Sequence, residues 1–330
     1  MLKTNTYLTL LFLGSFFSSE AQFFNRDNWQ DKRHQLEFGI GASNFMGELG
    51  GKDAIGTNDL QDFEIQETLL AAFVGYKWTM YKKWHIRTNL TYGQLSGDDK
   101  LTAEPFRNNR NLSFRSNIFE ATLLLEFEIP INKRKGHIYD IRGVRGWTHG
   151  GSSLYLFAGV GGLYFNPKTN VDGQWVELRP LRTEGQGLPD GPDEYKPYSW
   201  CLPVGLTISK RISPRTSVGI ELTYRYTFTD YIDDVSTEYY NPQDIALYVG
   251  GEEGQLASYL SNPSLGLAQE GLPNNVTAPG QQRGDETDND GYMFGWVKCQ
   301  YLLSDANRKT KGFNTKKRRY KKRKTKKVIF

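Results

Sequence analysis

Residues 117–130, NIFEATLLLEFEIP, place three glutamates inside one of the most apolar stretches of the chain. Every second residue of 119–129 is apolar, whereas the positions between them include Glu120, Glu126 and Glu128. A helix would scatter these glutamates around its cylinder, but a strand places them on one face. The pattern therefore predicts a β-strand with one apolar and one acidic face.

The same two-faced alternation recurs in seven further segments. These segments are 34–45, 67–80, 84–95, 152–165, 198–209, 217–229 and 291–303. Each has roughly ten or more residues, whereas ordinary globular strands have about five or six. Strands that cross a bilayer need about 9–11 residues. Strand length therefore favours a barrel in a membrane.

The connections between these segments alternate in length. Two are short (81–83 and 210–216) and four are long (47–66, 96–112, 166–197 and 230–290). Outer-membrane barrels combine short periplasmic turns with long external loops. The connection 130–151 is too long for a periplasmic turn and carries five Lys or Arg residues, so we interpret it as a contact surface.

Alternation alone does not separate a soluble barrel, apolar inside, from a membrane barrel, which is apolar outside. Long strands, alternating loop lengths and aromatic residues near strand ends favour the membrane form. The aromatic residues are Trp78, Tyr81, Trp84, Tyr164, Phe165, Tyr198 and Trp200. The predicted fold class is all-β: an eight-stranded antiparallel up-and-down transmembrane β-barrel over 34–303, with N- and C-termini in the periplasm.

This orientation predicts a charge network in the lumen, because a charge facing lipid costs up to about 2–4 kcal/mol at mid-membrane. Its members are Arg87, Glu120, Glu126, Glu128, Glu221 and Arg225. We expect Arg87 to partner the glutamates of 117–130, and Glu221 and Arg225 to pair with each other. An eight-stranded barrel is filled by its own side chains, which leaves anchoring, assembly or loop-borne activity as functions.

The two cysteines are expected to stay unpaired. Cys201 falls on the polar register of its strand. Val297, Cys299, Tyr301 and Leu303 form the predicted lipid face of the last strand. Non-adjacent strands and opposite faces do not suit a disulfide.

The N-terminus is typical of a cleavable signal peptide. Lys3 supplies a positive charge, residues 7–17 form a short apolar core, and Ala21 precedes the expected cut. This predicts a signal peptide over 1–21, an N-terminal periplasmic segment over 22–33, and location in the outer membrane of a Gram-negative envelope.

Residues 304–330 form a basic tail with thirteen Lys or Arg residues and one acid, although the whole chain is only +4. We predict partner binding by Lys316, Lys317, Arg318, Arg319, Lys321, Lys322, Arg323 and Lys324. A secreted barrel makes nucleic acid an unsuitable partner. A disordered, solvated tail, and docking to anionic lipid head groups, cell-wall polymer or an acidic periplasmic subunit, all stay open.

Other motifs predict no catalytic, cofactor or metal site and no small-molecule substrate. Gly159, Gly161 and Gly162 lie in a predicted strand without a following helix, so they do not form a dinucleotide fingerprint. Residues 285–291 begin like a calcium loop but have Val297 where the closing acid belongs. The four histidines show no metal spacing.

Several segments resemble a known family. GASNFMGELGG (41–51), TYGQLSGDD (91–99), RNNRNLSFRSNIFEATLLLEFE (107–128), LYLFAGVGGLYFNP (154–167) and ELTYRYTFTDYIDDVS (221–236) are similar to Bacteroidota outer-membrane barrels that include the PorG-type component of the type IX secretion system. The resemblance implies a non-enzymatic barrel that contacts the periplasmic ring, built from a lipoprotein and its ring partner. Outer-membrane lipid or lipopolysaccharide is the other expected partner. The alternative is a small outer-membrane enzyme, channel or adhesin that acts through its external loops.

Overall fold

The computed structural model describes residues 33–47, 49, 67–101, 104–131, 151–213, 215–266 and 276–303. The predicted signal peptide, nearly all of 22–33, most of 47–66 and of 130–151, and the tail 304–330 lie outside the described residues.

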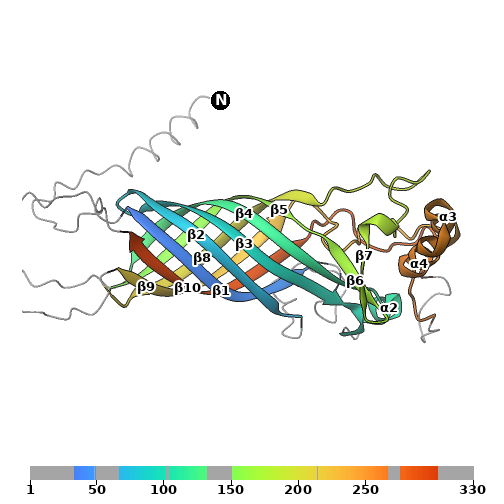
Figure 1. The fold of residues 1–330 in the computed structure, drawn as a ribbon, viewed down its shortest axis with the longest axis horizontal. Coiled ribbons are helices and arrows are strands. Elements are labelled where there is room, and N and C mark those ends of the chain that lie inside the picture. The colour runs from blue at the N-terminus through green and yellow to red at the C-terminus, as the bar shows by residue number, and fades with distance from the viewer. Residues whose placement is uncertain are drawn as a thin grey trace, which may run out of the picture.

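Eight long strands form one closed antiparallel sheet (Figure 1). They are β1 (His34–Met46), β2 (Leu69–Tyr81), β3 (Trp84–Asp98), β4 (Ser113–Pro130), β5 (Ser152–Tyr164), β8 (Tyr198–Arg211), β9 (Thr216–Thr227) and β10 (Gly291–Leu303). Neighbours along the chain are neighbours in the sheet, and β10 pairs back to β1. The predicted eight-stranded antiparallel up-and-down barrel is confirmed.

The two ends of the barrel differ in what they carry. His34 pairs with Leu303, so the barrel begins and ends at the same rim. The β2–β3 turn at Lys82 and Lys83 and the β8–β9 turn lie at this rim, which we call the short-turn end. All longer connections that the structure describes gather at the opposite end (Figure 1).

These longer connections fold into a cap that contains regular structure where the sequence predicted only loops. The cap elements are η2 (Asp99–Leu101), α2 (Pro105–Arg110), β6 (Pro167–Val171), β7 (Gln174–Glu177), η3 (Arg179–Leu181), α3 (Pro242–Val249) and α4 (Gly251–Ser261). β6 continues the barrel sheet by pairing with the start of β4, and β7 pairs with β6.

Local sequence explains where two of the cap helices begin. The Glu104 side chain accepts a hydrogen bond from the Arg107 backbone N–H at 2.7 Å, and Pro105 fills the first position of α2. Asn241 caps α3 in the same way through the backbone N–H of Gln243. Among the described residues, no helix has the length and apolar character required to span a membrane.

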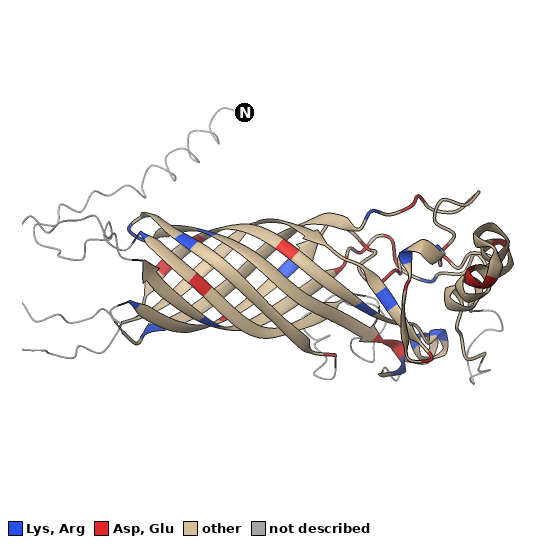
Figure 2. Ribbon diagram, viewed as in Figure 1, with Lys and Arg blue, Asp and Glu red and all other residues tan. Residues whose placement is uncertain are grey.

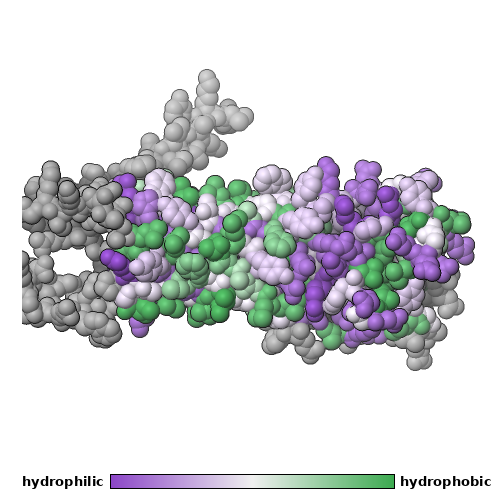
Figure 3. Space-filling model, viewed as in Figure 1, coloured by the Kyte–Doolittle hydropathy of each residue, from purple (hydrophilic) through white to green (hydrophobic). Residues whose placement is uncertain are grey.

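The barrel wall is apolar outside and polar inside. On β4, Leu125 is 46% exposed, whereas its neighbour Glu126 is 0% exposed. Ile40, Leu70, Leu90 and Ile220 also point outward on other strands. Figure 3 shows this apolar surface along the barrel, with more hydrophilic residues over the cap. A water-soluble barrel would have the opposite polarity, so the predicted orientation of the faces is correct.

Aromatic residues border this apolar surface at both ends. The exposed set near the cap is Tyr92, Phe119, Tyr164, Tyr198, Trp200, Tyr226 and Phe228, and the set near the short turns is Tyr76, Tyr81, Trp84 and Tyr301. The distance from Phe119 to Phe127 on β4 spans roughly 20 Å along the barrel axis for a strand tilted by about 40°. Phe165, predicted for such a girdle, is instead fully buried in the cap and stacks on Tyr195.

Candidate functional sites in the lumen and the loop cap

Six buried charged side chains meet in the barrel lumen toward the short-turn end. Three are acids and three are bases, and each comes from a different strand. The six are Glu37, Glu126, Glu221, Lys77, Arg87 and Lys298, which we call the luminal charge layer. Because charges are equal in number, the layer is neutral, which burial in a narrow lumen requires.

Arg87 contacts all three carboxylates of the layer. Its guanidinium lies 3.1 Å from Glu37, 2.9 Å from Glu126 and 2.7 Å from Glu221. The same group also lies 4.7 Å from the ring centroid of Phe157. The planar guanidinium presents five N–H donors in fixed directions, so one arginine holds three strands together.

Two lysines complete the layer. The Lys77 ammonium lies 2.8 Å from Glu37 and 2.7 Å from Glu126. The Lys298 ammonium lies 2.6 Å from Glu221 and 3.2 Å from Glu37. Each carboxylate therefore contacts at least two cations.

Neutral donors add to these ion pairs. The Thr207 hydroxyl donates to Glu221 at 2.7 Å, and the Gln300 side-chain amide donates to Glu37 at 2.9 Å. Removing a single member of such a network leaves an uncompensated buried charge.

A second buried ion pair lies closer to the cap. Arg225 donates to both oxygens of Glu120, at 3.0 Å to Oε1 and 3.1 Å to Oε2. The Tyr292 hydroxyl donates to the same carboxylate at 2.6 Å. Cys201 Sγ lies 3.9 Å from Glu120 Oε2, and the Arg225 guanidinium lies 4.5 Å from the Phe294 ring centroid.

Packed aromatic rings occupy the lumen between these two polar levels. The ring centroids of Phe73 and Trp296 are 5.0 Å apart, and those of Phe294 and Trp296 are 4.7 Å apart. Gly39 faces Phe73, and Gly93 faces Phe294; a Cβ atom at either glycine would overlap the ring. Glycines on the wall thus make room for rings that fill the lumen.

The structure corrects one predicted pairing. Glu221 and Arg225 do not pair with each other, although both point into the lumen. One lumen-facing residue, Thr223, lies between them on β9, so they sit at different heights in the lumen. Glu221 contacts Arg87 and Lys298, whereas Arg225 contacts Glu120 on β4. The remaining predicted member, Glu128, lies at the short-turn end, 3.4 Å from His85 Nε2, and accepts from Ser153 at 2.6 Å.

Sequence reasoning missed half of the luminal charge layer. Glu37, Lys77 and Lys298 each lie between outward-facing residues of an alternating strand, so the alternation already marked them as lumen-facing. Lys298, for example, follows Val297 and precedes Cys299, which both face outward as predicted. A search of every strand for charges at inward positions would have found all three.

The two cysteines lie on opposite faces, and both are free. Cys201 is buried in the lumen, whereas Cys299 lies on the outward face of β10 between Val297 and Tyr301.

The cap has its own buried polar cluster. Arg283 lies 2.7 Å from Glu184, which also accepts from the backbone N–H groups of Ser236 and Thr237 at 2.9 and 3.1 Å. This carboxylate therefore joins the segment after η3 to the segment after β9 and to the approach to β10.

Asp234 lies beside this cluster. Its carboxylate accepts hydrogen bonds from the Thr183 hydroxyl at 2.5 Å and from the Tyr195 hydroxyl at 2.6 Å. Burial raises the pKa of Asp234 to about 6, although Arg283 and the two hydroxyls act in the opposite direction. Burial, together with the nearby Asp234 carboxylate, raises the pKa of Tyr195 well above its usual value.

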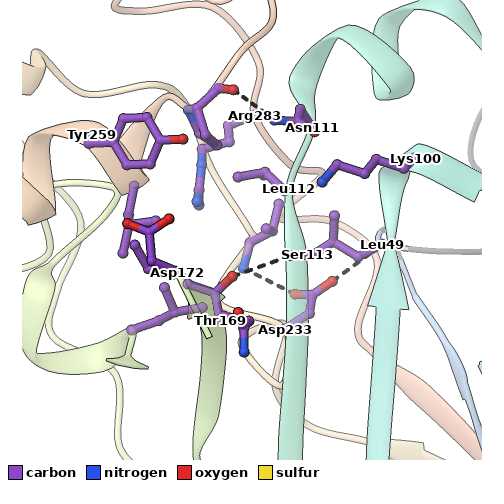
Figure 4. Close-up of a pocket in the computed structure, with 16 residues that line it drawn as sticks. Leu49, Lys100, Asn111, Leu112, Ser113, Thr169, Asp172, Asp233, Tyr259 and Arg283 are labelled. Atoms are coloured by element: carbon purple, nitrogen blue, oxygen red, sulfur yellow. Dashed lines mark hydrogen bonds between the residues drawn. The ribbon is translucent and has the colours of Figure 1, made fainter. Parts of the chain in front are cut away.

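A pocket of about 190 Å³ lies in the cap between β4, β6 and α4 (Figure 4). Its lining is mainly polar and includes Lys100, Ser113, Thr169, Asp172 and Arg283. Asp233, also in the lining, accepts from the backbone N–H of Leu49 at 3.3 Å. This mixture of cationic, anionic and hydroxyl groups does not indicate a particular ligand or reaction for the pocket.

Histidines and acids do not gather into a metal centre in the part of the chain that the structure describes. His34 and His85 both lie at the short-turn end, on β1 and β3. His137 and His149 fall outside the described residues.

A family model described as a domain of unknown function (DUF6089) matches residues 15–135, which include β1 to β4. No curated protein matches the sequence.

Three solved structures show a likeness to this chain. They are Ail, the attachment invasion locus protein of Yersinia pestis (8% identity, TM-score 0.33, covering 82% of this chain and 98% of that chain), Neisserial surface protein A (6%, 0.33, 82% and 96%) and the N-terminal β-barrel domain of Pseudomonas aeruginosa OprF (8%, 0.31, 82% and 98%).

The closed eight-stranded sheet, the apolar outer wall and the buried charges define a β-barrel membrane protein of the outer-membrane type.

Proposed function

We propose that this protein is a non-enzymatic outer-membrane barrel that anchors a protein-secretion assembly from its periplasmic side. The observation that carries the proposal is the filled lumen. The luminal charge layer and the rings of Phe73, Phe294 and Trp296 occupy the space through which a solute would pass. A barrel without a path through it acts through its two ends.

The orientation follows from the general design of outer-membrane barrels, whose short turns face the periplasm. In this orientation the cap faces the cell exterior, and both the start of β1 and the end of β10 lie on the periplasmic side. The basic tail 304–330 follows the end of β10 in the sequence. Its charge suits an acidic protein surface there.

The proposed partner is the periplasmic ring of a type IX secretion system, formed by a lipoprotein and its ring partner. Support comes from the resemblance of 107–128 and 221–236 to PorG-type barrels and from the basic character of the tail. The connection 130–151 adds a second basic segment on the same side.

A mild-detergent pull-down of the tagged full-length chain, with mass spectrometry of co-purified proteins, tests this function. We expect both ring subunits with the wild type and at least a tenfold loss when 305–330 is deleted. A tail in which the eight cations of 316–324 become Gln is the matched control, because it keeps the length but removes the charge. The proposal fails if ring subunits are absent from the wild-type pull-down.

Planar-bilayer recordings test the filled lumen separately. We expect no steady current from the reconstituted wild type. A stable open conductance would contradict the sealed lumen and favour a channel.

A second candidate function is binding at the cell surface through the cap. The observation that favours it is a group of exposed apolar side chains on α3 and α4, formed by Leu247, Tyr248 and Tyr259. The double variant Leu247→Asp/Tyr248→Asp would abolish surface adhesion in that case and leave co-purification of the ring subunits unchanged.

A further inference from the structure

Basic residues lie at the short-turn end of the barrel (Figure 2). They come from the residue before β1 and from both short turns: Arg33, Lys82, Lys83, Lys210, Arg211 and Arg215, which we call the basic rim. None of the last five has an ion-pair partner among the described residues. Among the described residues, Glu128 is an acid at this end, and its carboxylate contacts His85 and Ser153.

The β2–β3 turn has a lysine at a backbone position where a residue without a large side chain is usual. The turn has two residues, and Lys82 adopts the left-handed region at φ 33°. Two-residue hairpin turns with positive φ favour Asn and Gly, because a side chain with Cβ is strained there. Strain that persists at a residue points to a role for that residue.

The rim cations lie at the level of the aromatic girdle. Lys82 Nζ lies 5.4 Å from the ring centroid of Tyr81, and Lys83 Nζ lies 5.9 Å from that of Phe127. Tyr81 and Trp84, which flank the two lysines in sequence, are both exposed on the outer wall. Interfacial aromatic residues mark the depth of lipid head groups, and lysines extend their ammonium groups to this depth.

The cap has the opposite surface charge, so the basic rim does not reflect a generally basic protein. Exposed acids of the cap are Asp172, Glu177, Asp190, Asp193, Glu194, Glu238, Asp244, Glu252, Glu253, Asp285, Glu286 and Asp288. Figure 2 shows acidic residues along these cap segments.

We propose that the basic rim binds the phosphate groups of anionic phospholipids in the leaflet that it faces. This inference rests on membrane insertion and is independent of the secretion partner. The head-group depth of Lys82 and Lys83 favours lipid over a soluble acidic protein. Binding fixes the height and tilt of the barrel, because cations on two separate hairpins, β2–β3 and β8–β9, contact the same phosphate plane.

The test compares lipid retention by the full-length protein in nanodiscs of equimolar phosphatidylcholine and phosphatidylglycerol, followed by native mass spectrometry. We expect phosphatidylglycerol to be enriched among the retained lipids of the wild type. In the double variant Lys82→Gln/Lys83→Gln, this enrichment should fall about fivefold for each cation removed. The control is Lys100→Gln/Lys196→Gln, which removes the same charge from the exposed surface of the cap.

Unchanged enrichment in the rim variant, or an equal loss in the cap control, would overturn the proposal. Loss of a co-purified acidic protein with phosphatidylglycerol retention unchanged would do so as well. If the first variant fails to fold, Lys210→Gln/Arg215→Gln on the other hairpin provides the same measurement.

Discussion

The guanidinium of Arg87 on β3 donates one hydrogen bond to each oxygen of Glu221 on β9, at 2.7 and 3.0 Å, across the lumen of the barrel. The two residues are 134 positions apart in sequence. The closed sheet brings them together. Their neighbours along each strand face the lipid, so alternation places the two charged side chains in the lumen. This pair therefore reports directly on barrel closure.

Replacing Arg87 should destabilise the barrel strongly. Arg87→Met leaves three buried carboxylates with two ammonium groups, and breaking a buried ion pair on one side costs about 3–5 kcal/mol. We expect a fall of that size in the free energy of unfolding, measured in detergent by urea titration of the heat-modifiable gel shift.

The control restores neutrality. Arg87→Met/Glu221→Met leaves Lys77 and Lys298 with Glu37 and Glu126, so we expect it to be more stable than Arg87→Met alone. If the double variant were less stable by the sum of the two single losses, the two side chains would not be coupled.

The alternation of the sequence was sufficient to predict the strands and their faces. In a closed sheet bordered by lipid, each side chain has only two sides available, so period two assigns it to one of them. The last strand, whose sequence is ambiguous, follows the predicted register with Val297 outward and Lys298 inward.

Pairing inside the lumen depends on information that alternation does not carry. Arg225 bonds to Glu120 on the opposite wall because strand stagger sets these residues at the same height. The predicted pairing of Arg225 with Glu221 used their nearness in sequence, which does not determine which residues share a height in the lumen. The cap was missed for a related reason: Phe165 is buried by segments far along the chain, such as Tyr195, and not by its own strand.

Two glycines of β5 provide a matched test of inner and outer faces. A Cβ atom at Gly159 would overlap the Leu123 carbonyl oxygen and lie 2.9 Å from the Leu124 Cα, whereas at Gly162 it would meet only Trp200, at 4.0 Å. Backbone atoms have little freedom to move, so Gly159→Ala should cost about 1–3 kcal/mol.

Gly162→Ala is the control and should change the free energy of unfolding by less than about 0.5 kcal/mol, as is usual for a surface substitution. Both are measured by urea titration in the same detergent. Equal effects of the two substitutions would contradict the assignment of their faces.

Thiol labelling distinguishes lumen from lipid. Cys299 faces outward and Cys201 is buried against Glu120. In proteoliposomes we expect a lipophilic maleimide to label Cys299 and a charged maleimide to label neither cysteine. Cys201 should react only after unfolding in urea and detergent.

Peptide mass spectrometry identifies the labelled residue, and Cys299→Ser is the control that removes the lipophilic signal. Rapid labelling of Cys201 in the folded protein by the charged reagent would indicate a water-filled lumen. That result would contradict the packing of rings around Trp296.

The cap should lose stability as the pH rises from about 4 to about 6. The pKa of Asp234 is raised by burial from an ordinary value of 3.8 to about 6, so the folded cap binds this proton more tightly than the unfolded chain. Between these two pH values the folded state holds more protons, and its stability therefore falls with increasing pH. Such a difference in pKa corresponds to at most roughly 3 kcal/mol.

Hydrogen exchange of backbone amides in 231–239, corrected for the intrinsic dependence of exchange on pH, measures this loss. We expect protection to be highest near pH 4, to decrease through pH 6 and to be constant above about pH 7. Asp234→Asn keeps a side-chain oxygen that accepts from Tyr195 or Thr183 but does not titrate, so its protection should vary less across this range. Protection that instead increases from pH 4 to pH 7 in the wild type, and does so equally in Asp234→Asn, would show that the carboxyl of Asp234 does not control cap stability.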